Sequence, residues 1–399
     1  MVKNLRRWQH SAIRNQIFLY RQALENYYIR NKQIIQTDLG PAFSLLSPPV
    51  ASAASRRRLR YIVTNLIAQN KGAGATSNFE SRTPHFVTIA VTYDCQCDCL
   101  HCSASEYKKD AEVKQPCLNK QELKNIVRNT IKLGTTSIVF TGGEPLLKKD
   151  IYELIREVDR SKAICTIFTN GEYLTEEAVK KLKKSGAFGV FVSLDFADGP
   201  SHDQNRAREG IFLKALEGIK RAQKYGLLTG ISTYVTKEKI KNKELDRIME
   251  LGKKLNVLEV FIFDVIPVGK LEGEQKCLMD KEDFEWIREF RKRYNEKSDY
   301  PRIIHQTMLT SIAYPCTGEG CPAAVAHMHI RANGDVSPCD FTPVSFGNVR
   351  REPLKKIWEE MSSNELYSKA SSVCRLSDGR MWERLKEAAK DNSEVRVNG

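Results

Sequence analysis

Short apolar runs alternate with amphipathic stretches through the middle of this 399-residue chain. The apolar runs are rich in β-branched and aromatic residues, which is typical of strands. Six strands are predicted, near 86–92, 136–140, 164–169, 189–194, 229–235 and 258–265. Between them, apolar residues recur at helical spacing, for example in Lys120–Leu133, Thr175–Ser185 and Gly210–Tyr225. Strands that alternate with helices predict a parallel sheet, so we expect an α/β fold over residues 85–300.

Three cysteines lie in one short loop after the first predicted strand. Cys95, Cys99 and Cys102 have the spacing CxxxCxxC. Three thiolates on a tight loop can hold three irons of a four-iron cluster and leave the fourth iron open to a further ligand. The alternatives are three unrelated buried thiols or a zinc site with His101 as its fourth ligand. Structural zinc sites favour paired CxxC motifs or a closely spaced His pair, so the spacing favours the iron–sulfur interpretation.

A second motif, Gly142-Gly143-Glu144-Pro145, follows the second predicted strand. Together the two motifs resemble the radical S-adenosylmethionine (radical SAM) superfamily. The resemblance implies an enzyme in which Cys95, Cys99 and Cys102 hold a catalytic [4Fe–4S] cluster. There SAM would be cleaved to a 5′-deoxyadenosyl radical that abstracts hydrogen from a substrate C–H bond. It also implies a partial (β/α)6 barrel, TIM-like, with its chemistry at the C-terminal ends of the strands.

The resemblance further implies where SAM is bound. Glu144 would take the ammonium group of SAM, and Gly142 and Gly143 would let the backbone approach the ligand closely. The other positions expected to contact SAM are Pro145, Thr169, Asn170, Ser193, Asp195, Arg206 and Pro267. Asp195 and Arg206 could instead serve the substrate or form a structural salt bridge, and Pro267 could simply end a strand.

Four further cysteines, which follow residue 300, are Cys316, Cys321, Cys339 and Cys374. Asn333-Gly334-Asp335 predicts a hairpin turn between two short strands. The region resembles the SPASM/twitch extension of radical SAM enzymes, which binds auxiliary [4Fe–4S] clusters. A full SPASM domain has seven cysteines, so the resemblance implies one auxiliary cluster in residues 301–399. Four buried thiols without a metal are the alternative, and it stays open whether Cys316 and Cys321 both bind iron.

The remaining cysteines are not expected to bind a cluster. Cys97 lies inside the first loop and would only crowd it, Cys165 falls within a predicted strand, and Cys117 and Cys277 lie in loops. The chain has 11 cysteines and no recognisable secretory signal. An odd number of thiols argues against a disulfide framework, so we expect a reducing, cytoplasmic setting.

Residues 1–84 form a strongly basic extension, with 13 Lys and Arg residues against 3 Asp and Glu. Helical periodicity is predicted over Leu5–Ile34 and again from Arg56, with Pro41–Ala54 as a linker or an extended stretch. Three roles are open: a helical cap on the barrel, a peripheral contact with anionic membrane, and a grip for an acidic peptide or nucleic acid. No nucleic-acid-binding fold is recognisable, so a nucleic-acid partner is not expected.

The expected function is that of a radical SAM enzyme that oxidises or cross-links a peptide, a protein or a small metabolite. Its reductant would be a flavodoxin or ferredoxin, and the auxiliary cluster could accept an electron from the substrate. C–H chemistry on a lipid is a second option, which only the basic extension favours. A non-catalytic iron–sulfur protein is a third. No run approaches 18 apolar residues, so no transmembrane helix is expected.

Overall fold

One mixed sheet organises the molecule, for which we use a computed structural model. It describes residues 32–71, 82–105, 116–307, 309, 320–368, 371–391 and 396–397. The sheet has nine strands in the order β11-β10-β3-β4-β5-β6-β7-β8-β9. Their bounds are β3 (Phe86–Ala90), β4 (Ser137–Thr141), β5 (Ile164–Thr169), β6 (Gly189–Ser193), β7 (Leu228–Val235), β8 (Glu259–Asp264), β9 (Arg302–His305), β10 (His327–Ile330) and β11 (Val336–Ser337).

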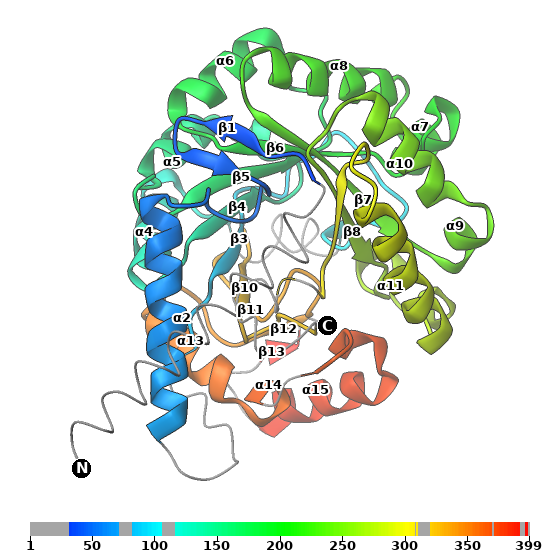
Figure 1. Cartoon of the computed structure of the whole chain (residues 1–399). Helices are drawn as coiled ribbons and strands as arrows, with labels where there is room; N and C mark the ends of the chain where they lie inside the picture. The colour runs from blue at the N-terminus through cyan, green and yellow to red at the C-terminus, as the bar shows by residue number, and fades with distance from the viewer. Residues whose placement is uncertain are drawn as a thin grey trace, which may run out of the picture.

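All neighbours from β10 to β9 run parallel, and only β11 is antiparallel to its neighbour. Helices cover the outside of the curved sheet (Figure 1). They are α4 (Lys120–Lys132), α5 (Ile151–Glu157), α6 (Glu176–Ser185), α7 (Gly199–Arg206), α8 (Ile211–Lys224), α9 (Lys237–Lys241), α10 (Glu244–Lys254) and α11 (Lys281–Asn295). The predicted α/β barrel with six βα units is therefore confirmed.

Local chemistry explains where these helices begin and end. Asn119 and Glu122 form a reciprocal capping box at the start of α4, and the Thr175 hydroxyl accepts a hydrogen bond from Ala178 N at the start of α6. Such side chains satisfy N–H groups that have no partner inside the helix. Gly186, with a φ of +96°, ends α6 in a left-handed conformation. The predicted helix limits agree with the structure because these signals are local.

The C-terminal region extends the barrel sheet instead of standing apart from it. β9 pairs with β8, and β10 pairs in parallel with β3, so the sheet is extended at both edges. The predicted hairpin at Asn333-Gly334-Asp335 joins β10 to β11, and Gly334 has a φ of +96°. The later elements are β12 (Val344–Ser345), α13 (Leu354–Ser363), α14 (Glu365–Ser368), α15 (Gly379–Asp391) and β13 (Arg396–Val397). A domain boundary near residue 300 remains a prediction, since the sheet continues across it.

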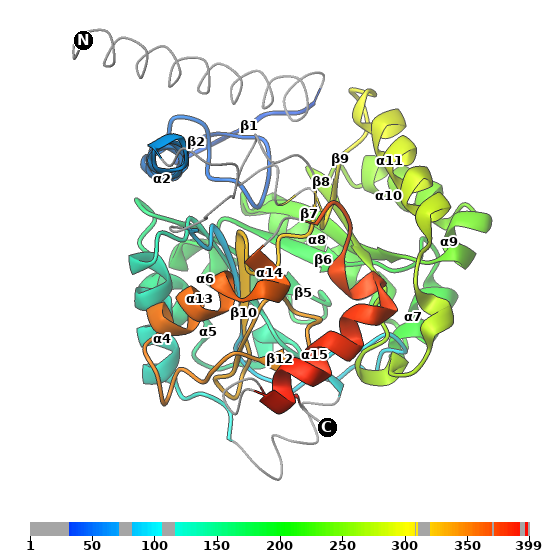
Figure 2. The same ribbon diagram turned by 90° about the horizontal axis from the view of Figure 1, so that it is seen from below.

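The basic extension contributes part of the core. Its described elements are β1 (Ile35–Thr37), β2 (Gly40–Ala42) and α2 (Ala53–Lys71), on one side of the barrel (Figure 2). The linker predicted at Pro41–Ala54 is wrong, because residues 42–49 are buried at the N-terminal ends of the strands. There Leu45 N–H donates to Glu259 Oε1 (2.7 Å), and the Thr166 hydroxyl donates to Leu45 O (2.7 Å). Most of the helix predicted over Leu5–Ile34 lies outside the described residues.

Several basic side chains of the extension are used inside the molecule. Lys32 donates to three carbonyl oxygens in the last turn of α11 and just after it, the closest at 2.5 Å. Arg57 binds carbonyls at the end of α4, and Arg82 binds those at the ends of α13 and α14. Cations are stabilised at helix C-termini, where carbonyl groups lack partners. The described part of the extension therefore packs as a cap on the barrel, as the first of the three alternatives expected.

Candidate active site

A cavity opens at the C-terminal ends of the barrel strands. Its lining includes ten of the residues that the sequence assigns to the cluster or to SAM. They are Cys95, Cys99, Cys102, Gly142, Gly143, Thr169, Asn170, Ser193, Asp195 and Arg206. The other three, Glu144, Pro145 and Pro267, are not among its lining residues. The fold thus brings most of the predicted residues to one place, from separate segments of the chain.

The cysteine loop that follows β3 is held at both ends by neighbouring turns. At its start, Gly143 N–H donates to Thr92 O (2.8 Å), and at its end Lys270 N–H donates to Cys102 O (3.2 Å). Gly269 lies against the same Cys102 oxygen, with a φ of +62°. The turn at Val265–Gly269, in which Pro267 is buried, therefore supports the cysteine loop.

The two glycines of the Gly-Gly-Glu-Pro motif also serve this packing. A Cβ on Gly142 would lie 2.2 Å from Thr92 O, and one on Gly143 would lie 2.2 Å from Asp94 O. Such contacts are far too close, so only glycine lets the motif pack against the cysteine loop. Both glycines also line the cavity, where the close approach to SAM expected from the sequence stays a prediction.

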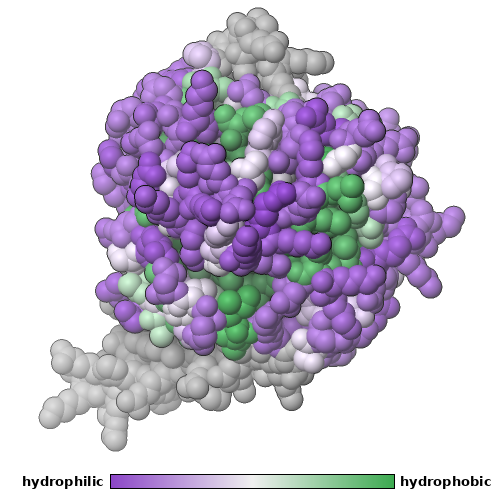
Figure 3. Space-filling view, turned by 90° about the horizontal axis from the view of Figure 1, so that it is seen from above, coloured by the Kyte–Doolittle hydropathy of each residue, from purple (hydrophilic) through white to green (hydrophobic). Residues whose placement is uncertain are grey.

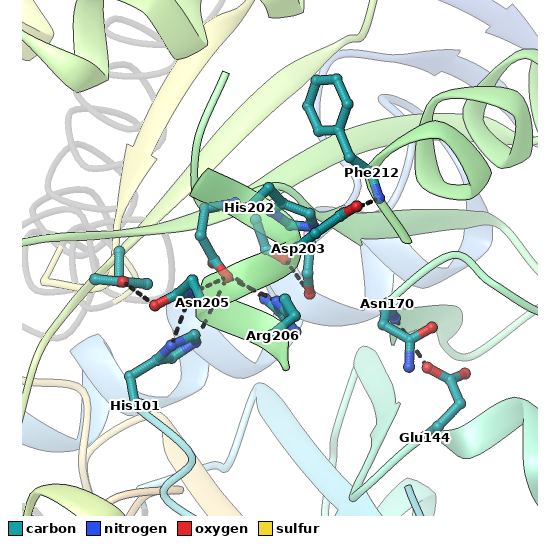
Figure 4. A network of polar contacts seen from close by, with 12 residues as sticks. His101, Glu144, Asn170, His202, Asp203, Asn205, Arg206 and Phe212 are labelled. Atoms are coloured by element: carbon teal, nitrogen blue, oxygen red, sulfur yellow. Dashed lines mark hydrogen bonds and ion pairs between the residues drawn. The ribbon is translucent and has the colours of Figure 1, made fainter. Parts of the chain in front are cut away.

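Glu144 is fully buried and joins two loops (Figure 4). Its carboxylate accepts hydrogen bonds from Leu146 N (3.0 Å), the Thr169 hydroxyl (2.8 Å) and Asn170 N (2.8 Å). Burial raises the pKa of Glu144 to about 7, although these hydrogen bonds oppose the shift. In this structure the carboxylate braces the turn after β5, and a direct contact with the SAM ammonium stays a prediction.

Asp195 and Arg206 form the structural salt bridge that was one of their expected roles (Figure 4). Arg206 Nε and Nη2 donate to the two Asp195 oxygens at 2.7 and 3.0 Å, and Asn205 Nδ2 donates to Asp195 Oδ2 at 2.8 Å. Burial alone would raise the pKa of Asp195, but the charge of Arg206 and other cations holds it well below its ordinary value. Both side chains also border the cavity, so their contact with SAM stays a prediction.

Cys97 lies among the predicted ligands of the first cluster. Its side chain is buried and packs with Cys99 and Ile211. The pKa of Cys97 is raised far above its ordinary value because its thiol is hydrogen-bonded to the sulfurs of Cys95 and Cys99. The pKa of Cys99 is lowered, first by that hydrogen bond and then by the charge of Arg206. Cys97 thus lies directly beside the predicted ligands, and its thiol holds its proton more tightly than Cys99 does.

The sequence motifs do not include several residues of the cavity. Ser232, Thr233 and Tyr234 come from the end of β7, and Asp264 ends β8. His101, from the cysteine loop, packs against Tyr234 with ring centroids 4.3 Å apart. The only available signal was their position, since polar residues that end a barrel strand face its active-site end.

Two buried polar atoms in the cavity, Asn170 Nδ2 and Thr233 Oγ1, have no hydrogen-bond partner among the residues that the structure describes. Buried polar groups normally have a partner, so these atoms indicate a polar ligand. The lining therefore combines three thiols spaced for a cluster with free polar atoms beside them. This donor set fits a cluster and SAM bound side by side.

A second cavity adjoins the first on the barrel's inner side. It is lined by Cys321, Cys339 and Cys374, the described cysteines of the C-terminal group. The pKa of Cys321 is lowered to about 6, mainly because its sulfur accepts a hydrogen bond from Cys374. Cys316 lies outside the described residues. The structure therefore brings together three of the four cysteines predicted to hold the auxiliary cluster.

The two cavities share part of their lining, namely Thr141, Phe168, Phe263, Asp340 and Phe341. Asp340 follows Cys339 and contacts His327 Nε2 (2.9 Å) and His329 Nδ1 (3.2 Å) on β10. In the described part of the chain, no three His, Cys, Asp or Glu side chains are placed to hold a single metal ion.

These features define a class of protein: a barrel enzyme with two cysteine groups on adjoining cavities at the active-site end. Comparison with known sequences gives the family. The radical SAM superfamily matches residues 89–252, and an iron–sulfur cluster-binding domain, SPASM, matches residues 321–377. The chain therefore carries a radical SAM domain followed by a SPASM domain, and its cofactors are SAM and [4Fe–4S] clusters.

Individual relatives agree with this assignment. An AdoMet-dependent heme synthase of Methanosarcina barkeri is 27% identical over 297 residues, covering 70% of this chain and 83% of the relative. An Fe-coproporphyrin III synthase of the same organism is 25% identical over 296 residues, covering 68% and 73%. Among solved structures, Streptococcus suis SuiB bound to the precursor peptide SuiA has a TM-score of 0.58 at 18% identity, covering 79% and 70%.

The surface is mainly polar where it can be seen. Figure 3 shows one face, viewed from above relative to Figure 1, on which hydrophilic side chains predominate and apolar ones form separate patches. Among the described residues, no helix combines the length and the apolar character needed to span a membrane.

Proposed function

We propose that the chain oxidises a C–H bond of a substrate held between its two cysteine groups. The observation that carries this proposal is the shared lining of the two cavities. One cavity contains Cys95, Cys99 and Cys102, the other contains Cys321, Cys339 and Cys374, and five residues border both. A substrate at the shared wall would be close to both groups.

In this proposal Cys95, Cys99 and Cys102 hold the catalytic cluster, and Cys321, Cys339 and Cys374, with Cys316, hold one auxiliary cluster. The auxiliary cluster would accept the electron that remains on the substrate radical after the hydrogen atom is removed, which completes the two-electron oxidation. Bound together, SAM and the reduced cluster supply hydrogen-atom abstraction from an unactivated C–H bond. The protein's own residues orient the ligands and exclude water. Thr169, Asn170, Ser193 and Thr233 offer polar contacts for SAM, and the turns around the cysteine loop keep its backbone in place.

The substrate class that we propose is an iron tetrapyrrole. The relatives described above, which cover about 70% of the chain, are named for heme or Fe-coproporphyrin III synthesis. The wall common to the two cavities is aromatic: Phe263 lies edge-on to Phe168 and to Phe341, at centroid distances of 5.8 and 6.0 Å. Aromatic side chains pack well against flat conjugated rings, so this wall suits a tetrapyrrole.

Two other substrates were expected from the sequence. A peptide or protein substrate has no specific support among the described residues. A lipid substrate would need the basic extension at a membrane surface. The reductant would be a flavodoxin or ferredoxin whichever substrate is used. The described cations Lys32, Arg57, Arg58 and Arg82 instead bind groups within the protein. These contacts favour a cap over a lipid-binding element.

The test is anaerobic turnover with reduced, cluster-reconstituted protein. SAM is added with iron coproporphyrin III, with a Cys- and Ser-containing peptide, or with anionic lipid vesicles, and both 5′-deoxyadenosine and the mass of each substrate are measured. We expect the iron tetrapyrrole alone to be converted, with 5′-deoxyadenosine formed in step. Conversion of the peptide or the lipid alone would overturn the substrate class.

The matched control is Cys99→Ala, which removes one predicted cluster ligand from the same loop. It should form no 5′-deoxyadenosine with any substrate. If the wild type also forms none above this control, the proposed reaction itself fails.

A further inference from the structure

We propose that Asp195, Asn205 and Arg206 are positioning residues that fix the cysteine loop around Cys99 and set the reduction potential of the cluster bound there. We call these three residues the α7 bracket. This inference rests on the proposal that the loop holds a cluster. It gives Asp195 and Arg206 a role that does not require contact with SAM or substrate.

The α7 bracket grips the loop on both sides of Cys99. Asp98 N–H donates to Arg206 O (3.1 Å), and Leu100 N–H donates to Asn205 O (3.0 Å). These backbone contacts fix the residues immediately before and after Cys99. The position of the Cys99 sulfur therefore depends on where the end of α7 lies.

The next loop residue, His101, is held by the same group. Asn205 Nδ2 lies 3.3 Å from His101 Nδ1, and the Tyr234 hydroxyl donates to Asn205 Oδ1 at 3.0 Å. The ring of Tyr234 in turn packs against His101. His101 is therefore held in place by packing and hydrogen bonding.

The end of α7 is itself rigidly anchored (Figure 4). Arg206 is the last residue of α7, and both of its contacts with Asp195 tie it to the end of β6. Asp203 accepts hydrogen bonds from Gly210 N (2.6 Å) and Phe212 N (2.9 Å) at the start of α8. The bracket is thus connected to the sheet and to the next helix, and it can transmit their position to the loop.

The bracket also places an ion pair beside the cysteine loop. Arg206 and Asp195 are joined by two hydrogen bonds, and both line the cavity that Cys99 lines. Charge and hydrogen bonds near the sulfurs are among the factors that set cluster potentials. Removal of the ion pair should therefore shift the potential of this cluster.

The test uses the full chain with reconstituted clusters and an EPR-monitored redox titration without SAM. The signal of this cluster is identified as the one absent from Cys99→Ala. Arg206→Lys keeps the charge but loses the two-point contact. The double variant Asp195→Asn with Arg206→Gln removes both charges while keeping the shape of the pair, and so avoids leaving a buried charge without its partner. Arg221→Gln on the surface of α8 is the control for loss of one positive charge.

We expect the double variant to titrate at a different potential from the wild type. Arg206→Lys should keep a potential close to the wild type but hold less iron and sulfide per chain, because the loop is less firmly fixed. Arg221→Gln should change neither quantity. The inference is overturned if both bracket variants keep the wild-type potential and iron content, even if they bind SAM more weakly. If the wild type holds no cluster at Cys99, the proposed function fails instead.

Discussion

The buried polar residues of the site form hydrogen bonds and ion pairs with other parts of the protein. Glu144, Asp195 and Arg206 all belong to motifs near the predicted SAM site, and the structure joins each to another segment of the chain. Glu144 connects two turns, and Asp195 connects β6 to α7. Their burial makes these contacts strong and sensitive to protonation.

Glu144 should make stability depend on pH. Its pKa is about 7 in the folded protein against an ordinary value of 4.5, so the folded state holds the proton more tightly. Its favourable contribution is then complete below about pH 4.5 and is lost as the pH rises through 7. Relative to Glu144→Gln, the wild type should lose roughly 3 kcal/mol between pH 4.5 and 8. Glu259 titrates in both proteins and cancels.

The measurement is the free energy of unfolding of the two proteins under anaerobic conditions across that pH range. Glu144→Gln also loses one acceptor, which adds an offset that does not change with pH. Two parallel curves would contradict the expected protonation of Glu144.

Cys97 provides a test within the cysteine loop itself. Because Cys97 lies outside the CxxxCxxC spacing of the predicted ligands, Cys97→Ala should keep the iron and sulfide content of the wild type. Cys99→Ala, two positions further on, should lose about four irons per chain. Equal losses in both variants, measured by iron and sulfide analysis, would make Cys97 a ligand.

The loops at the end of the barrel work as a set. The cysteine loop is held by the Gly-Gly-Glu-Pro turn, by the end of α7 and by the turn at Gly269. All three segments are distant from the cysteine loop along the chain, and the fold of the barrel brings them next to it. Preorganised support of this kind keeps ligands in position before the cofactor binds.

Gly269 can be tested against a close neighbour. An Ala Cβ at 269 would meet Cys102 O at 2.3 Å, whereas one at Gly273 would meet nothing within 4 Å. Both glycines have positive φ, +62° and +81°, so both substitutions cost similar backbone strain, on the order of 1 kcal/mol. Gly269→Ala should lower cluster content after reconstitution, while Gly273→Ala should not. Equal iron content would show that this turn does not support the loop.

Residues 42–49, which we call the plug because they are buried at the N-terminal ends of the barrel strands, should contribute strongly to stability. Leu45 is fully buried at the N-terminal ends of the strands, and Val50 is 41% exposed. Leu45→Ala should destabilise the protein by about 3 kcal/mol, and Val50→Ala by less than about 0.5 kcal/mol. Thermal unfolding of the two variants checks this. A small effect at Leu45 would mean that the plug is not part of the core.

The molecule is built around one nine-stranded sheet. The candidate active site lies at the C-terminal ends of its barrel strands. Hydrophobic periodicity was enough to predict the six barrel strands and their helices, because that signal is local. The plug was missed because Pro and Ser in 41–54 are typical of linkers, and its burial depends on residues such as Thr166 and Glu259, far along the chain.

The site was predicted to a similar degree. The cysteine spacing and the strand-end motifs named ten of the residues that line the cavity. Ser232, Thr233 and Asp264 were missed because they belong to no motif, and the partners of Glu144 and Arg206 depend on the folded arrangement. Pairing of β10 with β3, which brings Cys339 near the barrel, also has no local signal in the sequence.

The central claim is that two iron–sulfur clusters flank one substrate space. The most direct test is iron and sulfide per chain after anaerobic reconstitution. The wild type should hold about eight of each, and about four should remain when either Cys95, Cys99 and Cys102 or Cys321, Cys339 and Cys374 are replaced by Ala. About four in the wild type, falling to none without the first group, would contradict the account, because the C-terminal cysteines would then hold no cluster.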